Sequence, residues 1–168
     1  MHTFKTLQKP AVWTGPIAGA EARARELREP LWAPASYFVD DRGWSVMNLL
    51  TGALSPQGQC NYSVQHPGVV KAWHRHAHQT DFWFCLRGHI KVGVFDQDSG
   101  RAWLQVVGEQ SPGLMIIPPP LWHGAATVGA ERAGLFYYVT RAYDAASPDE
   151  ERLAYDGVEG FPWSARHG

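Results

Sequence analysis

A chain of 168 residues suits one domain with a single hydrophobic core, and its composition of 45% hydrophobic and 18% charged residues is typical of a globular protein. A formal net charge of -1 provides no general attraction to nucleic acid or to anionic membranes. No signal-like segment opens the chain, and no apolar run approaches the roughly 20 residues of a membrane-spanning helix. These features predict a cytoplasmic protein that binds neither nucleic acid nor membrane.

Residues 1–31 form a mixed N-terminal extension. Within it, residues 20–28 are rich in Ala, Glu and Arg and end before a proline, which predicts one short helix. From residue 32 onward, short runs of Val, Ile, Phe, Tyr and Trp alternate with Gly, Pro, Asp and Ser. Strands are expected at residues 35–39, 44–50, 59–65, 69–75, 81–86, 89–96, 102–107, 114–117, 123–127 and 135–140. About ten short strands at this spacing predict an all-β sandwich or barrel.

A C-terminal tail follows at residues 144–168. Ser147 in a capping position, Pro148 in the first helical position and acids in the first turn predict that this tail is helical. The expected organisation is a single domain over residues 1–168. Its core would span about residues 32–143, with short helical segments near both ends.

Three histidines and one aspartate form the pattern with the most chemical meaning. His74 and His76 lie two residues apart in a predicted strand, so their side chains share a face. Asp81 follows after a short bend, and His123 lies in a distant strand. This set can form a three-nitrogen, one-oxygen shell for Zn, Fe, Mn or Ni, and it selects weakly among them. The alternatives are a hydrogen-bonded polar cluster in a ligand cavity and an unrelated set of surface residues.

Aromatic and cationic residues add candidates for a substrate site, although each also has a structural interpretation. Tyr137 and Tyr138 are adjacent in a predicted strand, so only one of them can face a cavity. Trp83 belongs to a set of 8 tryptophans that either fill the core or stack against a sugar or base. Arg42 and Lys71 are candidate anion contacts.

The two histidine segments resemble the two motifs of the cupin superfamily. The first fits the spacing from Gly68 through His74 and Asp81 to Gly88, and in the second Pro120 stands at a glycine position. The resemblance implies a cupin double-stranded β-helix, or jelly roll, with the site inside the barrel mouth.

A narrower resemblance, over about residues 36–163, is to the dTDP-4-dehydrorhamnose 3,5-epimerase family of RmlC-like cupins. It is carried by residues 40–43, 68–74, 79, 87–88, 117–118, 123–124, 137–140 and 143. It implies that His74 is the base that removes a proton next to a sugar ketone and that Tyr137 is the acid. It also implies that Arg42 contacts a nucleotide diphosphate, and Gln79 is one of its matching positions. Together with the candidates Lys71 and Trp83 named above, Arg42 and Gln79 form the expected substrate-binding set. Members are homodimers that act on sugar nucleotides without metal or organic cofactor.

The chain departs from that family at several important positions. Lys71 stands in place of arginine, His76 in place of glutamine and Asp81 in place of lysine, and no aspartate partner for the base is found. These changes weaken a free histidine base and favour a metal-bound one. His74 and His76 also resemble the acid–base pair of sugar-nucleotide 3,4-ketoisomerases.

The sequence therefore predicts an epimerase or isomerase of a nucleotide-linked 4-keto sugar or a similar carbohydrate. The reaction would proceed by proton abstraction next to a carbonyl, with a divalent transition metal or without one, and without an organic cofactor. His74 cannot be both a metal ligand and a free base. The alternatives are a metal-dependent cupin dioxygenase, a non-redox isomerase or lyase on a small polar substrate, and a sugar-binding cupin without catalysis.

Overall fold

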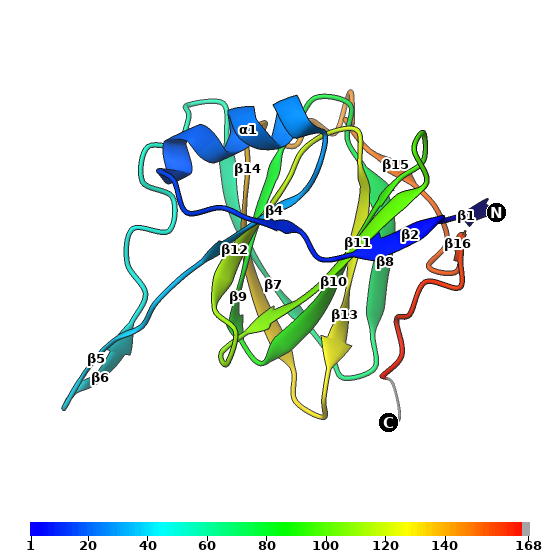
Figure 1. Cartoon of the computed structure of the whole chain (residues 1–168). Helices are drawn as coiled ribbons and strands as arrows, with labels where there is room; N and C mark the ends of the chain where they lie inside the picture. Colours follow the sequence, from blue (N-terminus) through cyan, green and yellow to red (C-terminus); the bar gives the residue numbers. More distant parts are fainter. Residues whose placement is uncertain (166–168) are drawn as a thin grey trace.

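Two six-stranded sheets face each other in the computed structural model, which describes residues 1–165 (Figure 1). The first sheet has the order β15 (Glu151–Arg152), β8 (Val70–Arg75), β13 (Trp122–Val128), β10 (His89–Asp96), β11 (Arg101–Gly108) and β2 (Thr6–Gln8). The second has the order β3 (Ala11–Val12), β4 (Leu31–Pro34), β12 (Gly113–Ile117), β9 (Asp81–Arg87), β14 (Ala133–Val139) and β7 (Gln59–Gln65). Apart from the β10–β11 hairpin and the β3–β4 pair, sheet neighbours are distant in sequence, and this arrangement confirms the predicted jelly roll.

The main core lies between the sheets, and it is built by alternation along the strands. Val92 and Val94 of β10 meet Met115 of β12 and Cys85 of β9 there. The thiol of Cys85 is buried, which raises its pKa to about 11, whereas Cys60 is exposed.

A second core covers the outer face of the second sheet. Helix α1 (Ala20–Leu27), which confirms the predicted N-terminal helix, buries Ala20 and Ala24 against Phe82 and Phe84 of β9. Because β9 is covered on both faces, its first five residues are all buried, and the strand reads as a continuous apolar run in the sequence.

The N-terminal extension also supplies strands to the sheets. Strand β1 (His2–Thr3) pairs in parallel with β16 (Val158–Glu159). Strand β2 pairs in parallel with β11, and β3 pairs in parallel with β4. A short 3₁₀ turn, η1 (Ile17–Gly19), precedes α1. The hairpin of β5 (Phe38–Asp40) and β6 (Gly43–Ser45) extends away from both sheets (Figure 1).

The prediction of a helical C-terminal tail is wrong for the part of the tail that the structure describes, and residues 166–168 lie outside it. Residues 144–150 contain turns, and β15 then pairs with the edge of β8. The Asp149 carboxylate accepts hydrogen bonds from another segment and is not available to the first turn of a helix. Tertiary pairing overrides the local helix signal. No helix within residues 1–165 has the length and apolar character needed to cross a membrane.

Candidate functional site

A cavity of about 990 Å³ lies between the two sheets. Strands β8 and β13 of the first sheet line one wall, and β7, β9 and β14 of the second sheet line the other. Residues from 141 to 153 border the cavity as well, so the C-terminal segment completes a site that the strands begin.

The structure brings together the four residues of the predicted metal pattern: His74, His76 and Asp81 line this cavity, and the buried His123 lies beside them. One side-chain ligand atom from each of His74, His76, Asp81 and His123 lies within 4.8 Å of the others. His123 of β13 pairs directly with His74 of β8, and Asp81 begins β9 in the opposite sheet. The group could hold a metal ion, and three of its members are buried while His74 is partly accessible from the cavity.

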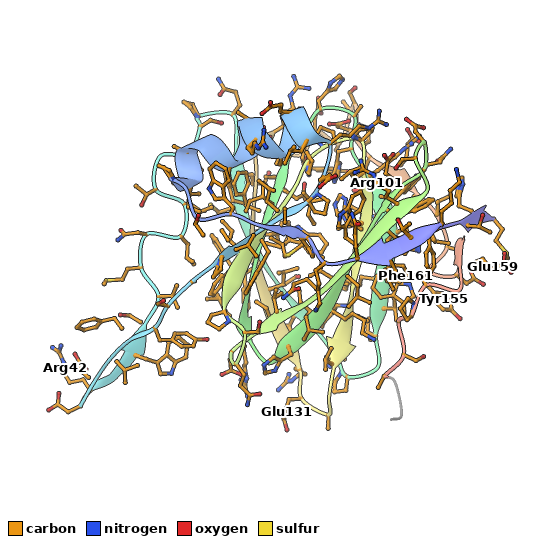
Figure 2. All side chains as sticks on the ribbon, in the orientation of Figure 1. Arg42, Arg101, Glu131, Tyr155, Glu159 and Phe161 are labelled. Carbon is orange, nitrogen blue, oxygen red and sulfur yellow. The ribbon has the colours of Figure 1, made fainter. Side chains whose placement is uncertain are left out.

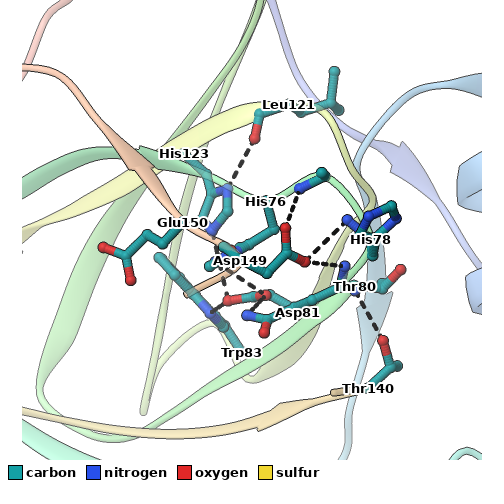
Figure 3. A network of polar contacts seen from close by, with 12 residues as sticks. His76, His78, Thr80, Asp81, Trp83, Leu121, His123, Thr140, Asp149 and Glu150 are labelled. Atoms are coloured by element: carbon teal, nitrogen blue, oxygen red, sulfur yellow. Dashed lines mark hydrogen bonds and ion pairs between the residues drawn. The ribbon is translucent and has the colours of Figure 1, made fainter. Parts of the chain in front are cut away.

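Backbone carbonyls fix the orientation of two of these imidazole rings (Figure 3). His123 Nδ1 donates to Leu121 O at 2.9 Å, and His76 Nδ1 donates to Asp149 O. A carbonyl only accepts, so each Nδ1 carries a proton and each ring directs its Nε2 toward Asp81. Those Nε2 atoms lie 3.8 Å (His76) and 3.5 Å (His123) from the Asp81 carboxylate oxygens.

Asp81 is an anion at the centre of the cluster. Its two oxygens accept hydrogen bonds from Gln79 Nε2 at 2.8 Å and from Trp83 Nε1 at 3.0 Å. Burial acts to raise the pKa of Asp81, but contact with His123 and the charges of His123 and His76 hold it well below its usual range. Lone pairs facing a carboxylate repel it unless a cation lies between them, and His123 Nε2 is buried without a hydrogen-bond partner in the described chain. A divalent transition metal or an imidazolium proton fits this requirement.

His74 is a neutral imidazole at neutral pH. Burial lowers its pKa well below the usual value for histidine, and the nearby charge of His123 lowers it further. The ring centroid lies 4.1 Å from that of His123 and 6.0 Å from that of Trp83. Since it is neutral, His74 is competent either to bind a metal or to accept a proton.

The loop that joins β8 to β9 is held in place by Asp149, a residue that the sequence analysis missed. The Asp149 carboxylate accepts three backbone N–H bonds, from Ala77 at 2.8 Å, His78 at 3.0 Å and Gln79 at 3.2 Å. Burial acts to raise the pKa of Asp149, but these donors keep it below its usual range. The loop carries His76 and leads to Asp81, so Asp149 positions both.

Tyr137 of β14 lines the cavity from the second sheet, while Tyr138 faces the other side of that sheet. The Tyr138 hydroxyl accepts a bond from Ser55 N at 2.9 Å, so it is a structural group. Burial raises the pKa of Tyr137, and the charges of Asp81 and Glu150 raise it further. Tyr137 is therefore a protonated phenol that can donate into the cavity.

Three of the four predicted substrate contacts line the cavity, namely Lys71, Gln79 and Trp83. Arg42 does not line this chain's own cavity, because it lies at the far end of the β5–β6 hairpin (Figure 2). Its side chain is 83% exposed and pairs with Asp40 of the same hairpin. The sequence located the hairpin but not the direction in which it extends.

Several lining residues were not anticipated from the sequence. They are Gln59, Asn61 and Ser63 of β7, and Arg141, Glu150 and Arg152 of the C-terminal segment. Alternation along β7 is a signal that could have identified the first three, because every second residue there is polar and partly buried. No comparable pattern marks the C-terminal residues.

A jelly roll with a His₃Asp group in its cavity defines the chain as a cupin. No family model matches it. It is 42% identical over 115 residues to the probable low-salt glycan biosynthesis epimerase Agl13 of Haloferax volcanii, covering 64% of this chain and 74% of that protein. It is 35% identical over 133 residues to the spore coat polysaccharide biosynthesis protein SpsL of Bacillus subtilis, covering 74% of this chain and 88% of that protein. The chain therefore belongs to the RmlC-like cupins, the carbohydrate epimerases related to dTDP-4-dehydrorhamnose 3,5-epimerase.

Solved structures share the fold. A dTDP sugar isomerase from Desulfovibrio desulfuricans G20 has a TM-score of 0.71 at 24% identity, covering 82% of this chain and 92% of that one. A dTDP-4-dehydrorhamnose 3,5-epimerase from Elizabethkingia anophelis has a TM-score of 0.65 at 19% identity, covering 82% of each chain.

Proposed function

We propose that this epimerase acts on a nucleotide-linked 4-keto sugar, or on a closely similar carbohydrate, by removing a proton from the carbon next to the ketone. The observation that carries the proposal is the position of Tyr137 opposite His74. Tyr137 comes from the second sheet, whereas His74 comes from the first. Inverting a carbon requires one group on each of its faces, and a cavity lined by two facing sheets provides this arrangement.

The remaining lining residues suit the two parts of such a substrate. Lys71, Arg141 and Arg152 offer cations to a diphosphate. Side-chain amide and hydroxyl groups of β7 offer hydrogen bonds to sugar oxygens, and Trp83 presents an aromatic ring. The names of the related proteins, which include an epimerase of glycan synthesis and a polysaccharide synthesis protein, support a carbohydrate substrate.

The site would hold a divalent transition metal through His74, His76, Asp81 and His123. The convergence of the Nε2 atoms of His76 and His123 on a buried carboxylate supports this assignment. Such a metal would supply a Lewis acid able to polarise a carbonyl oxygen. In the metal-free alternative His74 is the base, but no carboxylate within residues 1–165 hydrogen-bonds to its ring, so it lacks the partner that would raise its basicity.

We also propose that the chain forms a homodimer. The β5–β6 hairpin carries exposed apolar side chains, with Phe38 at 57%, Val39 at 69% and Trp44 at 53% exposure. Strand β7 is a sheet edge that exposes Tyr62 and Val64. Apolar groups on an extended hairpin and on an unpaired edge favour burial against a second copy, and light scattering of the purified protein tests this.

Isotope exchange tests the catalytic proposal. Incubation with a dTDP-4-keto-6-deoxy sugar in D₂O is expected to place deuterium on a carbon next to the ketone and to give the epimer, both followed by NMR. Elemental analysis is expected to find about one divalent metal per chain. His123→Gln should abolish that metal, and the matched control His66→Gln, which alters an exposed histidine, should retain it. Absence of exchange with every nucleotide-linked 4-keto sugar would reject the proposal.

A further inference from the structure

We infer that Glu150 is the catalytic carboxylate that takes the proton from the sugar carbon, an assignment that rests on the proposed epimerase function. This would separate the base from the metal group, so that His74 is free to serve as a ligand. The inference comes from the location, surroundings and support of Glu150.

Glu150 lines the cavity, and its carboxylate is mostly withdrawn from solvent. The side chain is 21% exposed, and the Oε1 atom is buried without a hydrogen-bond donor. The Arg152 guanidinium lies against Oε1 as an ion pair that lacks hydrogen-bond geometry. The other oxygen, Oε2, has no hydrogen bond or ion pair within the described chain and is not among its fully buried atoms, so in a substrate cavity it is a candidate for contact with substrate.

The backbone around Glu150 is fixed on both sides. On one side, Asp149 binds the three N–H groups of the β8–β9 loop and accepts from His76 (Figure 3). On the other side, β15 pairs with β8, and Leu153 exchanges two backbone hydrogen bonds with Trp73, at 2.9 and 3.1 Å. A base held at both ends is preorganised relative to the His/Asp group.

The other acids and imidazoles of the cavity are already engaged. His74, His76 and Asp81 converge with His123 on a common point. The Asp149 carboxylate is bound by three N–H groups, and the exposed Asp144 accepts a bond from Ala146 N. Among the lining carboxylates in the described part of the chain, Glu150 is the one that is mostly withdrawn from solvent and still has an oxygen, Oε2, without a partner.

Glu150 and Tyr137 reach the cavity from opposite sheets. Glu150 directly precedes β15 at the edge of the first sheet, and Tyr137 lies on β14 of the second. The charge of Glu150 contributes, after burial and Asp81, to the raised pKa of Tyr137, so the two groups interact across the same space.

The proton balance of the step is complete. A Glu150 oxygen takes the proton from the carbon next to the ketone. The electron pair of that C–H bond forms the C=C bond of an enolate, and the ketone oxygen takes the negative charge. Tyr137 then donates its proton to the opposite face of the same carbon, which restores the ketone with inverted configuration. Glu150 returns its proton to solvent, and the phenolate of Tyr137 regains one.

The experiment compares Glu150→Gln with Glu151→Gln. The second variant is a matched control, because Glu151 is the next residue, is 63% exposed and pairs with Arg75. Deuterium incorporation into a dTDP-4-keto-6-deoxy sugar is measured with metal content, binding of dTDP and thermal stability. Glu150→Gln is expected to slow exchange by about 100-fold or more while metal content and dTDP binding stay at wild-type values. Glu151→Gln is expected to match the wild type.

Two results would overturn the assignment in distinguishable ways. If the wild type exchanges and Glu150→Gln does so equally fast, Glu150 is not the base while the proposed function stands. If the wild type exchanges no nucleotide-linked 4-keto sugar, the proposed function and this inference fail together. Should Glu150→Gln fail to fold, Glu150→Asp replaces it. Drawing the carboxylate back by one methylene is expected to slow exchange more than tenfold at unchanged metal content, and unchanged exchange would refute the assignment.

Discussion

Replacing Asp149 with alanine tests whether the C-terminal segment holds the site together. The substitution removes the acceptor of three backbone N–H bonds of 2.8 to 3.2 Å. Bonds to a charged acceptor contribute about 1.5–3 kcal/mol each when buried, but Ala77 and His78 are exposed and water can replace part of each. A discounted value of about 1 kcal/mol per bond gives a loss of about 2–3 kcal/mol in the free energy of unfolding.

The assay combines stability with metal binding. For a chain of this length, about 2–3 kcal/mol corresponds to a fall in Tm of roughly 4–12 °C. Loosening the loop that carries His76 should weaken metal affinity by about 10–100-fold. Asp149→Asn keeps one acceptor oxygen and should show about half the loss of stability. Asp41→Ala, at the exposed hairpin turn, is the control. We call the contact between the Asp149 carboxylate and the three loop N–H groups the Asp149 clamp. A fall in Tm no larger than that of the control would show that this clamp does not stabilise the site.

Three further outcomes are expected. Tyr137→Phe should abolish epimerisation at unchanged Tm, whereas Tyr138→Phe leaves Ser55 N without its acceptor and should cost about 1–2 kcal/mol in a urea melt at unchanged activity. In chelator-treated protein, the unfolded chain binds a proton at His74 near pH 6.5 while the folded chain resists it. The free energy of unfolding should therefore fall as pH drops below about 6.5, by up to about 1.4 kcal/mol per pH unit, and His74→Gln should flatten this slope. Lys91→Met removes donors to three carbonyls, of residues 162–164, and should speed proteolysis of the C-terminal segment.

Spacing along single strands is what made much of the fold and of the His/Asp group predictable. His74 lies in β8 and His76 directly follows that strand, and Asp81 begins the next strand after the five-residue loop 76–80. These positions depend only on local spacing along the chain, so they can be predicted from the sequence. That His123 pairs with His74 across β13 and β8 depends on strand register, and only the cupin resemblance indicated it.

Direction and tertiary pairing are what the sequence could not provide. The β5–β6 hairpin was predicted as strands, but nothing local shows that it carries Arg42 away from its own cavity. The acids after Pro148 were interpreted as the first turn of a helix, because acids near a helix N-terminus are favourable. In the structure the Asp149 carboxylate instead accepts hydrogen bonds from three N–H groups of the β8–β9 loop, which lies some 70 positions earlier in the chain.

This pairing connects the fold to the chemistry. If residues 148–151 formed the first turn of a helix, the Asp149 carboxylate would face the N–H groups of that turn. The three N–H groups of the β8–β9 loop would then lack their acceptor. In the observed path, the Asp149 carboxylate binds that loop, whereas its neighbour Glu150 pairs with Arg152 through Oε1 and leaves Oε2 for the cavity. The loop position then sets His76 and Asp81, and the start of β15 sets Glu150, so one short segment fixes both the metal-type group and the proposed base. Loss of the Asp149 clamp should therefore lower metal binding and proton exchange together, whereas loss of the Glu150 carboxylate should lower exchange alone.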